Sequence, residues 1–172
     1  MTDKQTRIFV LTGMILAVAL VRFISLPFPN VAPIGAMALF GATYFRNKAL
    51  AFVVPLGALL LTDVFIGFHG VMPFVYGAFI AIGGIGLLLR NNVKTGNVAL
   101  AGLASAIVFF LVSNFGVWAT MPGPKNFATL MVTYELGLPF FRYTLLGDFI
   151  FISVLFGGFA LLQQRVPALQ RG

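Results

Sequence analysis

The sequence contains no cysteine, which excludes disulfide bonds, zinc–thiolate sites and thiol catalysis. It also has little charge: Asp, Glu, Lys and Arg together make up 9% of its 172 residues, and only four residues are acidic. Hydrophobic residues account for 60%, and the mean hydropathy is +1.03. Because so little polar surface cannot cover a soluble domain, the composition predicts a helical integral membrane protein.

Long apolar runs alternate with short polar or proline-containing segments. A helix needs about 20 apolar residues to cross a bilayer, with roughly 17 to 25 tolerated. We predict a single all-α membrane domain with six transmembrane helices, at residues 8–26, 31–45, 49–68, 71–89, 98–120 and 144–162. The second run is short for a span. The more polar stretch 121–143 is predicted to be a loop that acts as a lid.

The first run also has the outline of a signal peptide. Lys4 and Arg7 precede an apolar stretch that contains the triplet Ala17-Val18-Ala19. Apolar sequence continues beyond this triplet, which favours a retained span over cleavage. Cleavage would remove one span without inverting the others.

The basic residues are unevenly distributed between alternate loops. If all six runs cross the membrane, one side receives Lys4, Arg7, Arg46, Lys48, Arg90, Lys94, Arg165 and Arg171. The other side receives only Lys125 and Arg142 outside the apolar runs. This positive-inside bias predicts that both termini are cytoplasmic. It also explains the net charge of +7 without a nucleic-acid partner.

In this orientation the strongly polar residues of the apolar runs fall in the outer half of the membrane. A charged side chain there costs a few kcal/mol or more unless it has a partner or faces a cavity, so each is a candidate for function. We predict an outward-facing pocket for a small organic solute. Its candidate residues are Arg22, Asn30, Asp63, His69, Tyr76, Asn114, Trp118, Tyr134, Phe141, Arg142 and Asp148.

Each candidate also has a purely structural interpretation. Asp63 and Asp148 could pair with Arg22 or cap a helix, or they could hold polar groups of the solute. Trp118 shares a helical face with Asn114 four residues before it, which favours a pocket wall, although aromatic residues are also common at membrane interfaces. His69 fits either an interfacial residue without a role or a ligand contact.

Motifs of enzyme chemistry are missing from the sequence. It has no H-E-x-x-H, no G-x-S-x-G, no nucleotide fingerprint and no P-loop. We therefore expect no catalytic activity, no cofactor and no resident metal. Because a P-loop is missing, ATP-driven transport would need a separate motor protein.

Four stretches together resemble a family of small bacterial membrane proteins of unassigned function. They are residues 29–41, 63–69 together with 72–76, 113–118 and 138–148, the last with the sequence LPFFRYTLLGD. The resemblance covers nearly the whole chain. That family is described as transport proteins similar to the substrate-binding S components of energy-coupling-factor (ECF) vitamin transporters. The resemblance implies six helices, a vitamin or related micronutrient as solute, and the bacterial cytoplasmic (inner) membrane.

The same resemblance implies a possible partner, a separate ECF-type transmembrane and ATPase module. Small residues at helical spacing, such as Gly13 and Ala17, either pack helices closely within the chain or dock such a subunit. Two alternatives to transport stay open. One is a non-transporting membrane scaffold subunit, and the other is a lipid-modifying membrane enzyme.

Overall fold

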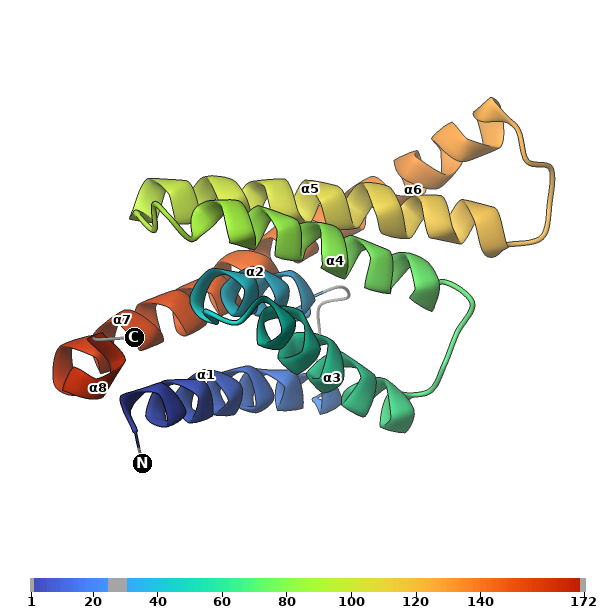
Figure 1. Ribbon diagram of the computed structural model, residues 1–172. Coiled ribbons are helices and arrows are strands. Elements are labelled where there is room, and N and C mark those ends of the chain that lie inside the picture. Colours follow the sequence, from blue (N-terminus) through green and yellow to red (C-terminus); the bar gives the residue numbers. More distant parts are fainter. Residues whose placement is uncertain (1, 25–30, 171–172) are drawn as a thin grey trace.

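The computed structural model describes residues 2–24 and 31–170, and all regular structure in these ranges is helical (Figure 1). Asn30, one of the predicted site residues, lies outside the described residues. The elements are α1 (Asp3–Ala19), η1 (Leu20–Phe23), α2 (Ile34–Tyr44), α3 (Lys48–Ile66), α4 (Met72–Leu89), α5 (Thr95–Thr120), α6 (Phe127–Ile152), the π-helical turn η2 (Ser153–Gly157), α7 (Gly158–Arg165) and α8 (Pro167–Gln170).

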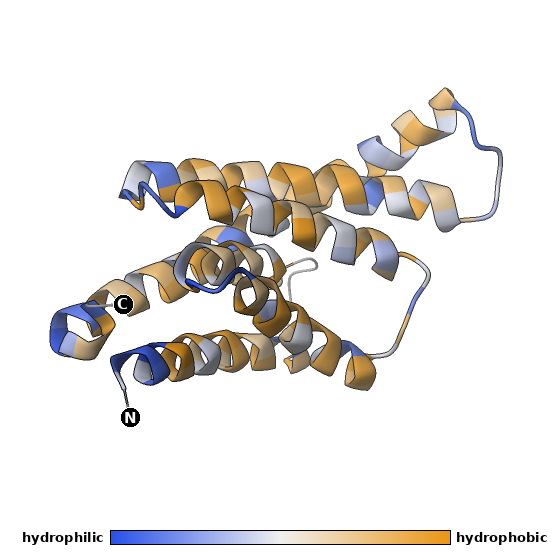
Figure 2. Ribbon diagram, in the orientation of Figure 1, coloured by the Kyte–Doolittle hydropathy of each residue, from blue (hydrophilic) through white to orange (hydrophobic). Residues whose placement is uncertain are grey.

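In the described part of the chain, five helical segments are long and apolar enough to cross a membrane, and α2 is a shorter apolar helix. Large apolar side chains cover the outside of the bundle, with Phe9 and Phe65 each 72% exposed and Leu88 82% exposed. Hydrophobic residues dominate the helices, whereas polar residues gather at the helix ends and in the connections (Figure 2). Such a surface is suited to lipid and not to water. The chain is a multi-pass helical membrane protein.

The connections between helices alternate between two ends of the bundle. The start of α1, helix α8 and the α2–α3 and α4–α5 connections lie at one end (left in Figure 1). Arg7, Arg46 and Arg90 lie at this end, which we call the basic end. The α3–α4 and α5–α6 connections lie at the other, which we call the opposite end.

Helix α2 forms the centre of the bundle. It packs against α1, α3, α4, α5 and α6, and its residues from Gly35 to Thr43 are all buried. Small residues allow neighbouring backbones to approach: a Cβ added at Gly86 of α4 would lie 2.6 Å from the carbonyl oxygen of Leu39. A buried helix of this kind depends on its neighbours, because its own length is too short for it to be stable as a span.

Charged side chains lie at both ends of α2. At its C-terminal end, Arg90 Nη2 donates to the carbonyls of Ala42 (2.8 Å) and Phe45 (2.6 Å), and Arg7 Nη2 donates to the carbonyl of Tyr44 (3.2 Å). At its N-terminal end, the carboxylate of Asp148 lies beside Gly35. Cations at the C-terminus and an anion at the N-terminus both complement the helix dipole.

The chain from 121 to 143 is not the loop that the sequence predicted. Only residues 121–126 lie between α5 and α6, and α6 begins at Phe127. Asn126 caps the helix, because its side chain accepts a hydrogen bond from the Thr129 N–H at 2.9 Å while the Thr129 hydroxyl accepts from the Asn126 N–H. The residues that made the stretch look too polar to span instead form the first turns of a long helix that packs against α5.

Candidate functional site

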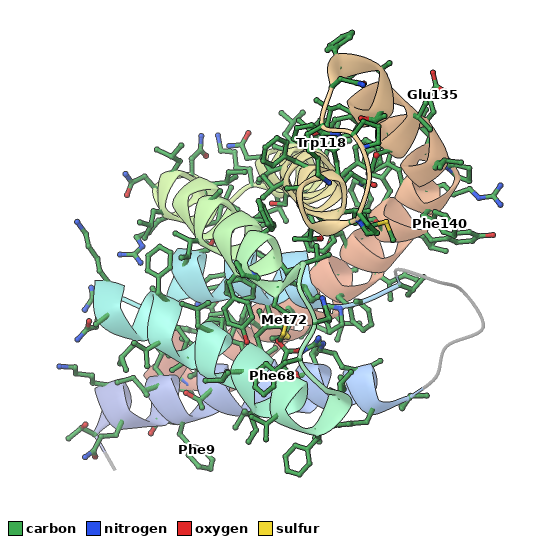
Figure 3. The ribbon with its side chains drawn as sticks, turned by 90° about the vertical axis from the view of Figure 1, so that its right-hand side faces the viewer. Phe9, Phe68, Met72, Trp118, Glu135 and Phe140 are labelled. Atoms are coloured by element: carbon green, nitrogen blue, oxygen red, sulfur yellow. The ribbon has the colours of Figure 1, made fainter. Side chains whose placement is uncertain are left out.

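The predicted site residues do not form one pocket. Eight of the eleven separate into three groups, and no hydrogen bond or ion pair among the described residues joins Asp148 to Asp63 or Arg22. Figure 3 views the molecule from the right-hand side of Figure 1, with Trp118 and Glu135 near the α5–α6 connection and Met72 towards the middle of the bundle. Each group has different chemistry.

The first group is an ion-pair network between η1, α3 and α4. Arg22 Nη2 lies 2.7 Å from Asp63 Oδ1, and the Tyr76 hydroxyl donates to Asp63 Oδ2 at 2.9 Å. Arg22 also donates to the Leu59 carbonyl at 3.2 Å and to the Thr62 hydroxyl. Because both oxygens of the buried Asp63 carboxylate have donors within the protein, this group needs no ligand to be satisfied.

The second group lies on the α5–α6 hairpin. The Tyr134 hydroxyl donates to the Leu111 carbonyl at 2.9 Å, and Trp118 Nε1 donates to Thr129 Oγ1 at 3.0 Å. The ring of Phe110 contacts those of Tyr134 and Phe141, with centroids 5.8 and 4.9 Å apart. The tyrosine and the tryptophan therefore hold the two helices together.

A small cavity lies within this second group. It has a volume of about 50 Å³, and its lining includes Ser113, Asn114, Phe141 and Thr144. Asn114 Nδ2 donates to the Phe110 carbonyl at 2.8 Å, while its Oδ1 lies so close to Gly137 that a Cβ there would be 2.4 Å away. Gly137 thus makes room for an amide inside the hairpin.

The third group is Asp148 with its surroundings at the start of α2. The residue is 2% exposed, and its Oδ2 has no hydrogen-bond partner within the described part of the chain. The carboxylate interacts with the backbone N–H of Ala36, and a Cβ added at Gly35 would lie 2.6 Å from Oδ1. A cavity of about 10 Å³ adjoins it, with Phe109 and Thr144 in its lining.

The start of α2 compensates only part of the cost of burying this charge. A helix N-terminus stabilises a nearby anion by about 0.3–1 kcal/mol, and at most by about 2 kcal/mol. Removing an ion from water costs several kcal/mol even after the surroundings relax. An ionised Asp148 is therefore under-compensated by its visible partners, in contrast to Asp63.

Two predicted residues lie outside these groups. His69 is exposed, and its backbone N–H contacts the sulfur of Met72 at 3.3 Å. Arg142 is exposed, donates to the Tyr143 hydroxyl at 2.9 Å and lies over that ring at 4.7 Å. Neither side chain converges on Asp63, Asn114 or Asp148.

Sequence reasoning missed several residues that shape these groups. Ser113, Thr144 and Phe109 line the cavities, while Gly35 and Gly137 make room for polar side chains. The only available signal was spacing, since Thr144 precedes Asp148 by one helical turn. Small and weakly polar residues are too common in membrane helices for that signal to stand out.

Larger cavities lie at the basic end, where the sequence predicted none. One has a volume of about 630 Å³, with Lys4, Arg7, Arg46 and Leu11 in its lining. Others of about 500 and 430 Å³ adjoin it, and Tyr44 lines all three. In the described ranges, no group of three or more His, Asp or Glu residues is placed to hold a metal ion.

The fold and the buried polar groups define the chain as a multi-pass helical membrane protein with ionisable side chains inside its bundle. Within that class, residues 2–169 match a family of unknown function, DUF6580, and the chain belongs to this family. No curated protein and no solved structure matches it.

Proposed function

We propose that this protein is a membrane transport protein that binds a small organic solute, a vitamin or related micronutrient, in the manner of an ECF S component. The observation that carries the proposal is the pair of adjoining cavities between α5, α6 and the start of α2. Asn114, Phe141 and Asp148 line them, and Phe109 and Thr144 are common to both.

The lining of these cavities has the character of a small-molecule site. Rings from Phe109, Phe110 and Phe141 supply apolar walls, while Asn114 and Thr144 supply a few polar atoms. Sites for small molecules are mostly apolar with a small number of placed polar groups. The aromatic walls would give loose specificity for ring-shaped or apolar parts of the solute. The Asn114 amide would orient the solute by hydrogen bonding.

The cavities must widen to admit an organic solute. Volumes of about 50 and 10 Å³ are far below the roughly 300–1,000 Å³ of typical ligand pockets. Pro139 supplies the means, because a proline inside a helix removes a backbone hydrogen bond and bends it. The part of α6 before this proline, residues 127–138, would act as the moving element in place of the predicted lid loop. We call it the arm.

The positive charge of the basic end indicates how the protein is oriented in the membrane. Helix α1 and η1 end at the opposite end and α3 begins at the basic end, so α2, which lies between them in the sequence, runs in the direction that returns the chain through the bundle. This supports six crossings. The positive-inside rule supports a cytoplasmic basic end. In this proposal both termini face the cytoplasm of a bacterium, the protein spans the inner membrane, and the solute cavities lie in its outer half.

Helix α1 offers a surface for a partner. Gly13 and Ala17 are both exposed, and a Cβ added at Gly13 would meet no atom within 4 Å. Close packing inside the chain therefore does not explain this pair. A separate ECF-type transmembrane and ATPase module could dock on this face of α1, since small residues permit close helix approach.

The proposal is tested by identifying what the protein binds. The protein would be purified in mild detergent, and small molecules released from it would be analysed by mass spectrometry. We expect one organic solute that is lost from Asn114→Leu and Phe141→Ala and retained in Arg142→Gln, whose side chain points away from the cavities. Equal retention by all variants, or no solute from the folded protein under uptake conditions, would refute the proposal.

One observation favours a second function, that of a membrane scaffold subunit. The network of Arg22, Asp63 and Tyr76 is satisfied within the protein, as expected for residues that only hold helices together. A scaffold would co-purify with a protein partner and would contain no bound solute. Affinity purification would compare the unaltered protein with the Gly13→Leu variant. A protein partner that binds the α1 face should co-purify with the unaltered protein and be lost from the variant.

A further inference from the structure

Asp148 is a buried carboxylate without a cation beside it. It is 2% exposed, and Oδ2 has no hydrogen-bond partner among the residues that the structure describes. Asp63 provides an internal comparison, because it is 4% exposed but lies 2.7 Å from Arg22 and accepts from Tyr76. The two carboxylates thus share burial and differ in charge compensation.

The elements that pack on Asp148 offer no counter-charge. The residues around its cavity are Ala32, Ile34, Gly35, Phe109 and Thr144. Helix α5 has no titratable side chain, and the only one on α2 is Tyr44 at its far end. On α6 itself, Tyr134 and Glu135 lie more than three turns away, and Arg142 pairs with Tyr143. Among the residues that the structure describes, no cationic side chain is placed to neutralise Asp148, so a proton is the simplest source of neutralisation.

The space beside the carboxylate is very small. About 10 Å³ corresponds to one water molecule and excludes an organic group. From there, the shared residues Phe109 and Thr144 lead to the cavity of about 50 Å³, where Ser113 and Asn114 add further polar atoms. Hydroxyl and amide groups in this order can hold a short file of water molecules between Asp148 and the middle of the α5–α6 hairpin.

From this arrangement we propose that Asp148 is a proton-binding site inside the membrane, and that it exchanges its proton through the water file along Thr144, Ser113 and Asn114. In the protonated state the new O–H bond lies on Oδ2 and the carboxyl is neutral. The water molecule in the small cavity donates a proton to Oδ2 and takes a replacement proton from the next water of the file, so no hydroxide is left behind. Deprotonation reverses these transfers and returns the proton along the same file. The site does not depend on the solute proposal. If coupled to that solute site, it would let a proton gradient drive uptake, an extension that rests on the proposed function.

The proposal is tested with dicyclohexylcarbodiimide, a hydrophobic reagent that adds to protonated carboxyl groups in apolar surroundings and forms a stable N-acylurea. The full-length protein in lipid vesicles would be treated over a pH series, and labelled peptides would be located by mass spectrometry. We expect labelling at Asp148 that falls by about tenfold per pH unit once the carboxyl is mostly ionised. Asp63 should remain unlabelled, because Arg22 and Tyr76 occupy both of its carboxylate oxygens.

Two variants test the route. Thr144→Val and Asn114→Leu keep side-chain size while removing polar atoms from the file, and they should slow proton exchange at Asp148. Exchange would be followed by the decay of the carboxylic C=O infrared band after a pH jump. That band should be missing from Asp148→Asn and present in Asp63→Asn.

Three results would overturn the proposal. One is a folded protein with no labelled Asp148 and no carboxylic band attributable to it. Another is labelling that does not change with pH. The third is labelling of Asp63 as strong as that of Asp148, which would mean that the reagent reports burial alone. Solute binding plays no part in these readouts, so failure here and failure of the transport proposal are distinguishable.

Discussion

Two carboxylates at similar burial have opposite surroundings in this protein. Asp63 is held by Arg22 and Tyr76, which lie on different helices, whereas Asp148 faces the start of α2 and a small cavity. The first arrangement fixes the relative position of η1, α3 and α4. The second leaves a carboxylate whose cost of burial is only partly offset. At the scale of single residues, we therefore expect substitutions around Asp63 and around Asp148 to have different effects.

The Arg22–Asp63 pair should contribute strongly to stability. Arg22→Met leaves Asp63 buried without its cation, and breaking a buried pair in this way costs about 3–5 kcal/mol. The measurement is the thermal and denaturant unfolding of the protein in detergent. The double variant Arg22→Met/Asp63→Leu should recover most of the loss, because no charge stays behind. A double variant as unstable as the single one would show that the pair is not the cause.

Gly35 should be required as long as Asp148 carries its carboxylate. A Cβ at Gly35 would lie 2.6 Å from Asp148 Oδ1, so Gly35→Ala forces a shift that we expect to cost about 1–3 kcal/mol. Adding Asp148→Ala removes the clashing atoms and should restore part of the stability. Gly57→Ala is the matched control, since a Cβ at Gly57 meets nothing within 4 Å and alanine favours a helix. Equal losses at both glycines would contradict the contact.

At the scale of elements, the ends of α2 should be the sensitive points of the central helix. Arg90 donates to the carbonyl of Ala42 in the last turn of the helix and to those of Phe45 and Arg46, which follow it. Hydrogen bonds to a charged group contribute about 1.5–3 kcal/mol, so Arg90→Ala should lower the unfolding free energy by about 2 kcal/mol. Lys94→Ala, an exposed change in the same connection, should have little effect. Similar effects from both variants would point to general charge loss instead.

The bend in α6 should matter for solute exchange more than for stability. Pro139→Ala restores the missing backbone donor and straightens the helix, so the unfolding free energy should stay the same or rise. If the arm opens the cavities, solute uptake by this variant should fall by about tenfold, which corresponds to about 1.4 kcal/mol. Unchanged uptake in Pro139→Ala would rule out the arm as the moving element. Leu136→Ala, an exposed change on the arm, serves as the control.

The helices that sequence predicts well are those whose ends coincide with hydropathy changes. The predicted runs 49–68, 71–89 and 98–120 correspond to α3, α4 and α5 within three residues at each end. The prediction of a loop at 121–143 was wrong, because a hydropathy pattern contains no information on helix capping, and Asn126 caps a helix here. Polar residues such as Thr129 and Glu135 lower the mean hydropathy of the arm, but they do not interrupt its helix.

The sequence indicated which polar residues are candidates for the site, but not which of them contact one another. Hydropathy and rarity selected Arg22, Asp63 and Asp148, all of which are at least partly buried within the bundle. Which of them pair depends on how each helix is rotated about its axis. Packing contacts such as Gly35 against Asp148 set that rotation, and a single sequence does not reveal them.

At the scale of the whole molecule, the clustering of basic residues predicts the orientation in the membrane. A reporter fused after Gly172 should be active on the cytoplasmic side, and one inserted next to Gly123 should be active outside. Gly123 lies in the α5–α6 connection at the opposite end, where a positive φ of 129° marks a turn that tolerates insertion better than a helix does. Signals from the same side at both sites would contradict six crossings.

The position of α2 has a consequence for biogenesis. Its Gly35–Thr43 stretch is enclosed by helices from both halves of the chain, and α3 to α6 are synthesised after it. Eleven residues are too few to partition into lipid as an independent span. During translation α2 must therefore wait at the translocation channel or the membrane surface until later helices arrive. Assembly of this protein consequently cannot proceed strictly from the N-terminus, and the burial of α2 in the bundle is among the last steps to be completed.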